Sequence, residues 1–238
     1  MGAPRRIVVL TGAGISAESG MATFRSPDGL WQRHRVEDVA TPEGFARDPH
    51  LVHRFHNTLR AAAAAAEPNA AHRALARLEA AGRHDLLIVT QNVDDLHERG
   101  GSRRVLHMHG SLGSALCAAC GHRWPAPMEM EPSALCPACA RPGARPDVVW
   151  FGEIPYHMDQ IWDALREADL FVSIGTSGQV YPAAAFAQDA ARAGARTLEL
   201  NLDPSALSAE FDESRQGPAT RLVPEWVNSL LGGRRSPI

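Results

Sequence analysis

The chain has 238 residues, which is enough to bury a full-sized core, so one large domain with an insertion is the natural expectation. Apolar residues make up 45% of the chain and charged residues 21%, which fits a globular enzyme and excludes a disordered chain. The net charge of −3 gives no reason to expect binding to nucleic acid or to anionic membranes.

Short apolar strands alternate with helical patterns along the chain. The β-branched run at residues 7–10 predicts a buried parallel strand, and a helix is expected at 15–21. Further strands are expected at 85–90, 104–106, 169–174 and 196–200, and further helices at 51–66, 70–81, 158–168 and 183–193. This alternation predicts an α/β fold with a doubly wound parallel sheet. Polar clusters follow the strands, where such sheets bind ligands, at 11–16, 91–95, 175–177 and 201–203.

The first polar cluster contains a Gly-rich turn. Residues 12–17 fit the G-x-G-x-x-G/A pattern, in which glycines let backbone amides approach a pyrophosphate, although a plain strand-to-helix turn is the alternative. A dehydrogenase would carry an acidic residue at the end of a second strand. Glu37 and Asp38 lie at about the right distance, but no strand precedes them, so hydride transfer is disfavoured.

Two further clusters carry amide, carboxylate and imidazole groups. Residues 91–94 (Gln-Asn-Val-Asp) and 107–110 (His-Met-His-Gly) each follow a predicted strand. An imidazole such as that of His109 can accept a proton near neutral pH. Together with the Gly-rich turn, these groups predict an enzyme that breaks NAD rather than one that oxidises with it. Ordinary turn residues, or a metal pair formed by His107 and His109, are the alternatives.

Residues 111–147 break the alternating pattern and form an inserted module rich in Cys, Pro, Ala and Gly. Two C-x-x-C pairs within it, separated by fifteen residues, predict one structural Zn²⁺ held by four thiolates, Cys117, Cys120, Cys136 and Cys139. Four thiolates leave no open coordination position for chemistry. A nucleic-acid-binding zinc ribbon is poorly supported, because Arg residues are few here and Trp124 stands alone.

In their order, these motifs resemble those of the sirtuins, NAD-dependent protein-lysine deacylases, and most closely the bacterial class III branch. The resemblance covers nearly the whole chain through motifs at 12–20, 23–25, 29–31, 36–44, 90–94, 107–110, the four cysteines, 148–153, 175–177 and 201–203. It implies a sirtuin catalytic domain over 1–238, with Rossmann-like portions at about 1–31, 70–111 and 148–238. A helical insertion at about 32–69 and a zinc-binding module at about 112–147 would form the smaller part.

The resemblance implies that NAD is a co-substrate bound in the cleft between the two parts. Phe24 would cover the reaction centre, Arg25 would help to bind the phosphates, and Asn92 would hold the ribose next to nicotinamide. The implied NAD-binding residues are Gly12, Ala13, Gly14, Ile15, Ser16, Glu18, Phe24, Arg25, Trp31, Gln91, Asn92, Val93, Asp94, Gly175, Thr176, Ser177, Asn201, Leu202, Asp203 and Ala219.

The resemblance also implies a reaction in which the acyl-lysine oxygen attacks the ribose as nicotinamide leaves. His109 would be the general base and Asn92 its catalytic partner, and the products would be lysine, nicotinamide and 2′-O-acyl-ADP-ribose. The acylated protein or peptide would add as a strand through main-chain hydrogen bonds. The implied substrate-binding residues are His56, Leu59, Val149, Phe151, Gly152, Glu153, Gly178, Val180 and Tyr181.

One departure from the class III pattern concerns the acyl group. That branch carries a Tyr-x-x-Arg pair that binds succinyl or malonyl carboxylates, whereas this chain has His56 and Leu59 there. Arg60 lies about 100° further around the helix and should point away. Losing a charge-assisted pair costs about 1.5–3 kcal/mol, so acetyl or a neutral, somewhat longer acyl group is expected. A protonated His56 could still support acidic acyl groups.

Other readings stay open at this level: desuccinylation or demalonylation, mono-ADP-ribosyl transfer to protein, or a non-catalytic NAD-binding or zinc-ribbon module. No apolar run is long enough for a signal-peptide core or a membrane span, so a cytoplasmic location is expected. The sequence does not determine the oligomeric state, and a monomer is the expectation. It contains no Lys, so the enzyme cannot be acylated on lysines of its own.

Overall fold

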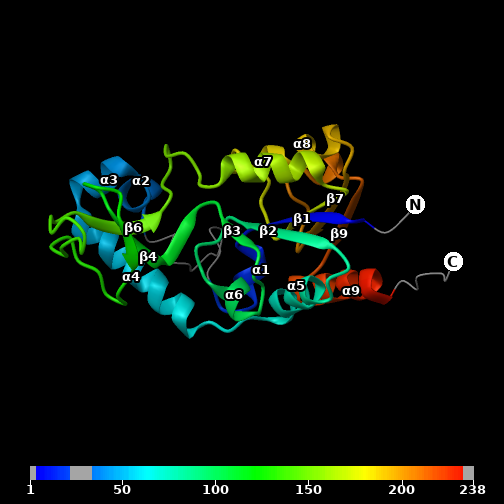
Figure 1. Cartoon of the computed structure of the whole chain (residues 1–238), viewed down its shortest axis with the longest axis horizontal. Coiled ribbons are helices and arrows are strands. Elements are labelled where there is room, and N and C mark those ends of the chain that lie inside the picture. The colour runs from blue at the N-terminus through cyan, green and yellow to red at the C-terminus, as the bar shows by residue number, and fades with distance from the viewer. Residues whose placement is uncertain (1–3, 22–33, 233–238) are drawn as a thin grey trace.

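The computed structural model describes residues 4–21 and 34–232. Figure 1 shows two parts that lie side by side along the long axis of the molecule. A large sheet with helices on both faces forms one part, and a small sheet with the helices α2, α3 and α4 forms the other. Within the described ranges, no helix is long and apolar enough to cross a membrane.

The large sheet has six strands in the order β3-β2-β1-β7-β8-β9, and every neighbouring pair is parallel. The strands β1 and β7 are buried on both faces, as their apolar, largely β-branched sequences predict. The predicted doubly wound parallel sheet is therefore confirmed. The strands are β1 (Arg6–Thr11), β2 (Asp85–Thr90), β3 (Val105–His107), β7 (Leu170–Ile174), β8 (Arg196–Asn201) and β9 (Glu213–Gln216).

Helices cover both faces of this sheet (Figure 1). The helices α5 (Ala70–Ala80) and α9 (Ala219–Gly232) build one buried apolar cluster with the strands, and α7 (Met158–Glu167) and α8 (Phe186–Arg192) build a second on the opposite face. Shorter elements complete this part: α1 (Gly14–Ala17), α6 (Leu96–Arg99) and two 3₁₀ turns, η2 (Ala183–Ala185) and η3 (Ser208–Glu210).

The differences from the sequence-based expectation include three elements of the large part. The helix expected at 15–21 is the single turn α1, and the chain then reaches Gly20 in the left-handed region with φ of +89°. The strand β9 was not predicted because its sequence, Glu-Ser-Arg-Gln, has no apolar residue. The helix α9 was also missed, although its buried residues Leu222, Val223, Trp226 and Val227 have the spacing of one helix face.

The smaller part combines an antiparallel sheet of order β5-β4-β6 with three helices. The side chains of Leu112 and Val148 from this sheet pack against Val52, Phe55 and Leu59 in one apolar cluster. The three helices lie within the range predicted for the helical insertion, whereas β4 begins before and β6 ends after the predicted zinc-binding module at 112–147. The domain limits stay a prediction. The elements are β4 (Gly110–Cys117), β5 (Arg123–Pro125), β6 (Ala144–Val148), α2 (Val36–Val39), α3 (Pro42–Arg47) and α4 (Pro49–Ala65).

Arg60 joins α4 to the small sheet and to the loop that follows β5. Its guanidinium is buried and donates to the carbonyl oxygens of Leu112 (2.8 Å) and Met128 (3.1 Å), and to Asn57 Oδ1 (2.7 Å). Burial lowers the pKa of this guanidinium from its usual value. The side chain is thus committed to structural contacts.

Replacing Arg60 with Met should lower the free energy of unfolding by about 2–4 kcal/mol, because the carbonyl oxygens of Leu112 and Met128 then lose a charged donor. Arg54→Met is the matched control, since Arg54 lies exposed on the same helix. Urea unfolding of both variants measures the difference. Equal stability of the two variants would show that the Arg60 contacts contribute nothing.

Candidate active site

Two Gly-containing turns meet where the strand order of the large sheet reverses, between β1 and β7. Gly12 N–H donates to the Ile174 carbonyl oxygen (3.0 Å), and Gly14 N–H donates to that of Gly175 (2.9 Å). A Cβ on Gly14 would lie 2.7 Å from Gly175 Cα, and one on Gly175 would lie 2.5 Å from Ile15 N. Glycine is therefore required by the contact between the turns. The carboxyl ends of both strands lie at one edge of the sheet, where such folds bind ligands in a crevice, and a pocket lined in part by Leu10, Ser173 and Gln91 lies there.

The predicted residues of the 91–94 loop lie at this crevice, held by a buried network with Ser16. The side-chain amide of Asn92 donates to the Gly12 carbonyl oxygen (3.2 Å) and to Ser16 Oγ (3.1 Å). Ser16 in turn donates to Asp94 Oδ2 (3.2 Å), and Leu96 N–H donates to Asp94 Oδ1 (3.1 Å). Burial raises the pKa of the Asp94 carboxyl above its usual value. Both N–H groups of Asn92 are used, so its Oδ1 is the atom left for a ligand.

Two histidines behind this network were not singled out from the sequence. His97 Nε2 lies 3.0 Å from Thr11 Oγ1, Thr11 donates to Thr90 Oγ1 (2.8 Å), and Asn92 N–H donates to the same oxygen (3.0 Å). His72 Nδ1 accepts from Asn69 N–H (3.3 Å), so its Nε2 is the donor to Ser16 Oγ (3.5 Å). Burial lowers the pKa of His72 to about 4 and that of His97 well below its usual value.

His109 reaches the crevice from the turn between β3 and β4. Its Nδ1 lies 3.1 Å from the carbonyl oxygen of Gln91, which only accepts, so Nδ1 carries the proton and Nε2 is the basic nitrogen. Burial lowers the pKa of His109, and this hydrogen bond partly offsets the effect. The next residue, Gly110, has φ of +82°, and a Cβ there would lie 2.1 Å from the Asp147 carbonyl oxygen. Only glycine allows β4 to start so close to β6.

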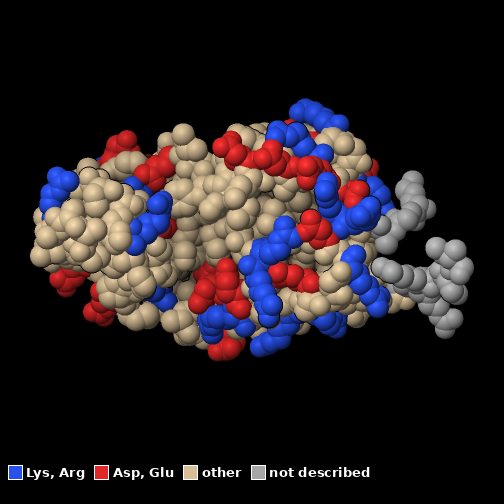
Figure 2. Space-filling model, in the orientation of Figure 1, with Lys and Arg blue, Asp and Glu red and all other residues tan. Residues whose placement is uncertain are grey.

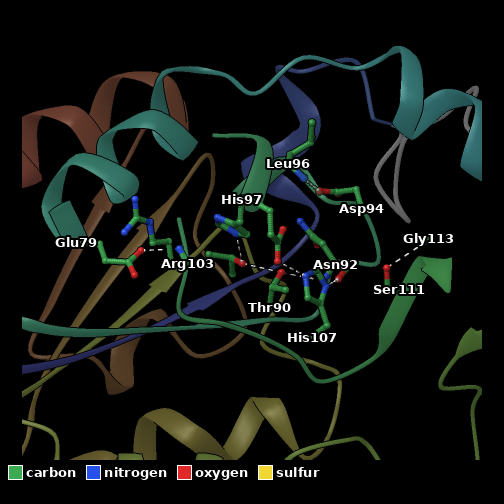
Figure 3. A network of polar contacts seen from close by, with 12 residues as sticks. Glu79, Thr90, Asn92, Asp94, Leu96, His97, Arg103, His107, Ser111 and Gly113 are labelled. Atoms are coloured by element: carbon green, nitrogen blue, oxygen red, sulfur yellow. Dashed lines mark hydrogen bonds and ion pairs between the residues drawn. The ribbon is translucent and has the colours of Figure 1, made fainter. Parts of the chain in front are cut away.

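His107, the last residue of β3, has acceptors at both ring nitrogens. Nδ1 lies 3.1 Å from the carbonyl oxygen of Asn92, and Nε2 lies 2.8 Å from Glu98 Oε1. Figure 3 shows Thr90, Asn92 and His107 close together, below Leu96 and His97. His107 and His109 therefore hold the carbonyl oxygens of two successive residues, Asn92 and Gln91. Each ring donates to protein groups instead of sharing a metal ion with the other.

The turn after β7 and the end of β8 form the opposite side of the crevice. Asn201 Nδ2 donates to the Thr176 carbonyl oxygen (2.7 Å), and the Ser177 hydroxyl accepts from Gln179 N–H (3.3 Å). Gly175, Leu202 and Asp203 belong to the same two segments, with Leu202 exposed. Ala219 starts α9, where both carboxylate oxygens of Glu18 accept from Thr220, at 3.0 and 2.6 Å. Glu18 therefore caps α9, a contact that the sequence did not reveal.

The predicted substrate residues include exposed positions on two segments and buried positions on α4. Phe151, Gly152, Val180 and Tyr181 are exposed, Val149 and Gly178 are partly buried, and His56 and Leu59 are buried on α4. Arg145 holds the 148–153 segment: it donates to Glu153 at 2.7 and 2.9 Å, and its guanidinium lies 3.5 Å from the Trp150 ring centroid. Three predicted cofactor residues, Phe24, Arg25 and Trp31, lie outside the described residues.

The four predicted cysteines come together in the small module. Their sulfur atoms all lie within 4.8 Å of one another, and the Cys117–Cys139 and Cys120–Cys136 sulfur atoms are 3.7 Å apart, too far for disulfides. Four sulfurs about 2.3 Å from a tetrahedral Zn²⁺ would be about 3.8 Å apart. The cluster therefore fits the predicted metal and leaves no coordination position for a reacting molecule.

A Rossmann-like sheet, an anchored 91–94 loop and a four-cysteine module define the class to which this chain belongs. The model of the Sir2 family matches residues 12–182. An NAD-dependent protein deacylase of Caulobacter vibrioides is 57% identical over 230 residues, which are 95% of this chain and 97% of that protein. An NAD-dependent protein deacylase of Salmonella typhimurium is 54% identical over 231 residues, 96% of this chain and 85% of that protein. The chain belongs to the Sir2 family.

Solved structures agree with this assignment. A Sir2 homologue–NAD complex is 39% identical, with a TM-score of 0.89, and covers 96% of this chain and 90% of its own. A mutant Sir2 homologue in complex with ADP-ribose is 38% identical, with a TM-score of 0.91, and covers 99% and 95%. A Sir2 protein bound to acetylated peptide is 27% identical, with a TM-score of 0.81, and covers 96% and 94%.

Zinc removal should unfold the small module, because such sites contribute about 10–16 kcal/mol of binding free energy to folding. We expect one Zn²⁺ per chain by atomic emission, and Cys117→Ser should lower both the zinc content and the melting temperature. Met128→Ser is the control, because Met128 is an exposed residue of the same module. Unchanged melting of zinc-free Cys117→Ser protein would contradict a structural role for the metal.

Proposed function

We propose that this chain is an NAD-dependent protein-lysine deacylase, which converts acyl-lysine and NAD to lysine, nicotinamide and 2′-O-acyl-ADP-ribose. The observation that carries the proposal is the protonation pattern of His109. Its Nδ1–H is fixed on the Gln91 carbonyl oxygen, and its free Nε2 is available beside the loop that carries Asn92 and Asp94. The names of the relatives, NAD-dependent protein deacylases, point to the same chemistry.

The crevice residues have the chemistry that NAD requires. The turn with Gly12 and Gly14 places main-chain atoms close to the edge of the sheet, where a pyrophosphate could lie. Asn92 would offer its Oδ1, and Asp94 would offer a buried carboxyl group to the nicotinamide side. Bound NAD would supply an activated ribose carbon, and these residues would hold the ribose and the carboxamide in place. The 175–177 and 201–203 segments would hold the adenosine half.

His109 would then remove a proton from a ribose hydroxyl. Because its pKa is lowered, the imidazole is neutral and ready to accept a proton at physiological pH. A correctly placed general base of this kind accelerates a reaction about 10²- to 10⁴-fold. Burial of the surrounding loop would also keep competing water from the activated ribose.

The acylated segment would bind between residues 149–153 and 178–181. Phe151, Val180 and Tyr181 expose apolar side chains on these two segments, and a bound peptide could pack against them. Figure 2 shows few charged side chains over β3, β4 and the loop that leads to α7. Glu153 is held by Arg145, so it would contribute to substrate binding through its backbone while its carboxylate braces the segment.

Acetyl or another neutral acyl group is the substrate that the α4 residues favour. His56 is 2% exposed, and its Nδ1–H donates to the Val52 carbonyl oxygen (2.9 Å). Burial lowers its pKa to about 4, so the ring carries no charge at neutral pH and cannot pair with a succinyl carboxylate. Leu59 is apolar, and Arg60 is committed to Leu112 and Met128.

An acyl-peptide panel with NAD tests the activity. Mass spectrometry should find O-acyl-ADP-ribose, with turnover of acetyl or crotonyl above that of succinyl peptide. His109→Tyr should reduce turnover about 10²- to 10⁴-fold, whereas the exposed His122→Tyr should not. Since the chain has no Lys, every deacylated lysine belongs to the peptide. Labelled protein without O-acyl-ADP-ribose would instead indicate ADP-ribosyl transfer, and unchanged NAD would indicate a binding module.

The acyl preference can be tested by restoring the acidic-acyl pair. The double variant His56→Tyr with Leu59→Arg should raise the ratio of succinyl to acetyl turnover about 10- to 100-fold, because it restores a charge-assisted contact. His56→Tyr with Thr58→Arg is the matched control, since Thr58 is exposed on the same helix. Dominant desuccinylation by the unaltered enzyme would contradict the preference.

A further inference from the structure

The ring of His107 bridges the 91–94 loop and α6. Nδ1 faces the carbonyl oxygen of Asn92 at 3.1 Å, and Nε2 faces Glu98 Oε1 at 2.8 Å. A carbonyl oxygen and a carboxylate can only accept, whereas a neutral imidazole has a single N–H. Both bonds can form together only when the ring carries two protons, as an imidazolium paired with the Glu98 carboxylate.

We propose that His107, held as an imidazolium by Glu98, is a positioning residue that fixes the Asn92 carbonyl and thereby the loop that acts on NAD. The proposal presupposes the deacylase function above and adds a role for a residue outside the implied catalytic and binding sets. His107 acts through Asn92. Both of its nitrogens are occupied by protein groups, so it has no free position at which to exchange a proton with a substrate.

The neighbouring groups favour this charged state. Burial opposes a charge on His107, but the hydrogen bond and negative charge of Glu98, the Asn92 carbonyl and the carboxyl of Asp94 together raise its pKa. For Glu98, burial favours the neutral acid, but the bond to His107 and its charge lower the pKa overall. His97, the third titratable group that faces this ring, is kept neutral by its own burial.

The bond from His107 to the Asn92 carbonyl completes a set of contacts that hold the backbone and side chain of Asn92. Its N–H binds Thr90 Oγ1, and its side-chain amide binds Gly12 and Ser16. The peptide group after Asn92 leads directly to Val93 and Asp94, so its orientation contributes, with the bonds from Ser16 and Leu96, to the position of the Asp94 carboxyl. Val93 O accepts from Leu112 N–H (2.9 Å) on the small module. Releasing the Asn92 carbonyl would loosen the loop between these two anchors.

Opposite pKa shifts of the two histidines give a bell-shaped pH profile. His109 must be neutral to act as a base, and its lowered pKa places the acidic limb below its usual value of 6.5. His107 must be protonated to hold Asn92, and its raised pKa keeps that contact up to a pH above 6.5. Activity should therefore fall on the alkaline side as the pH rises through the pKa of His107.

Glu98→Gln is the main test, because it keeps an acceptor for Nε2 but removes the charge that holds the second proton. The alkaline limb of kcat/KM for NAD should move to lower pH by about one unit, since a one-unit shift corresponds to the loss of one modest charge interaction. The acidic limb should stay in place. An alkaline limb at the same pH in this variant would overturn the proposal.

Two substitutions of His107 itself separate positioning from folding. His107→Leu should lose about 10-fold or more in kcat/KM together with the His107-dependent alkaline limb, as expected for a charged hydrogen bond. His107→Asn places an uncharged donor near the position of Nδ1 and should recover part of the rate. His50→Leu, at an exposed histidine of α4, is the control. If the Leu and Asn variants lost the same kcat/KM and had equally lowered melting temperatures, His107 would have only a structural role.

Imidazole NMR provides a readout that does not depend on turnover. In the unaltered protein, the resonance absent from His107→Asn should titrate with a pKa above 6.5, and Glu98→Gln should lower that pKa. A neutral His107 ring at pH 6.5 in an active enzyme would defeat the positioning proposal alone. Absence of any NAD consumption by an enzyme whose His107 is protonated would instead defeat the proposed function.

Discussion

The site depends on the contact between the turns that follow β1 and β7. Parallel strands bring their carboxyl ends to one edge of a sheet, and here the order reverses between these two strands. Gly12, Gly14 and Gly175 lie so close that a Cβ on any of them would be within 2.5–2.8 Å of backbone atoms of the opposite turn. This approach sets the floor of the crevice. The groups on β2, β3 and β8 reach the same space because their strands are in register with these two.

The histidines show how burial and partners divide one residue type into several roles. His56, His72 and His97 are buried without a carboxylate partner and are neutral, so each serves as a fixed hydrogen-bond group. His107 is also buried, but the hydrogen bond and charge of Glu98, with smaller contributions from the Asn92 carbonyl and Asp94, raise its pKa. His109 meets a single carbonyl oxygen and keeps a free nitrogen. Two histidines with opposite pKa shifts therefore lie only two residues apart, His107 at the end of β3 and His109 in the turn that follows.

The sequence predicted the parts whose signal is local. Apolar strands followed by polar clusters predicted the parallel sheet, and the spacing of Cys117 to Cys139 predicted the cysteine cluster that the structure brings together. Contacts between distant segments left no such signal. The bond between Glu18 and Thr220 joins residues 202 positions apart, and the Arg60 contacts depend on how a helix docks on another module. A charged or amide side chain does not reveal its partner in the sequence, so these contacts are seen only in the folded chain.

The same distant contacts explain why a metal site without chemistry would matter for the reaction. The strand β6 leaves the cysteine module and continues directly into residues 149–153, the proposed substrate segment. Arg145 on β6 fixes this segment through Glu153 and Trp150, while Arg60 fixes α4, with His56 and Leu59, to β4. The Val93 carbonyl oxygen of the 91–94 loop accepts from Leu112 N–H, also on β4. The four-cysteine module therefore supports a small sheet from which α4, the 149–153 segment and one end of the 91–94 loop all take their positions.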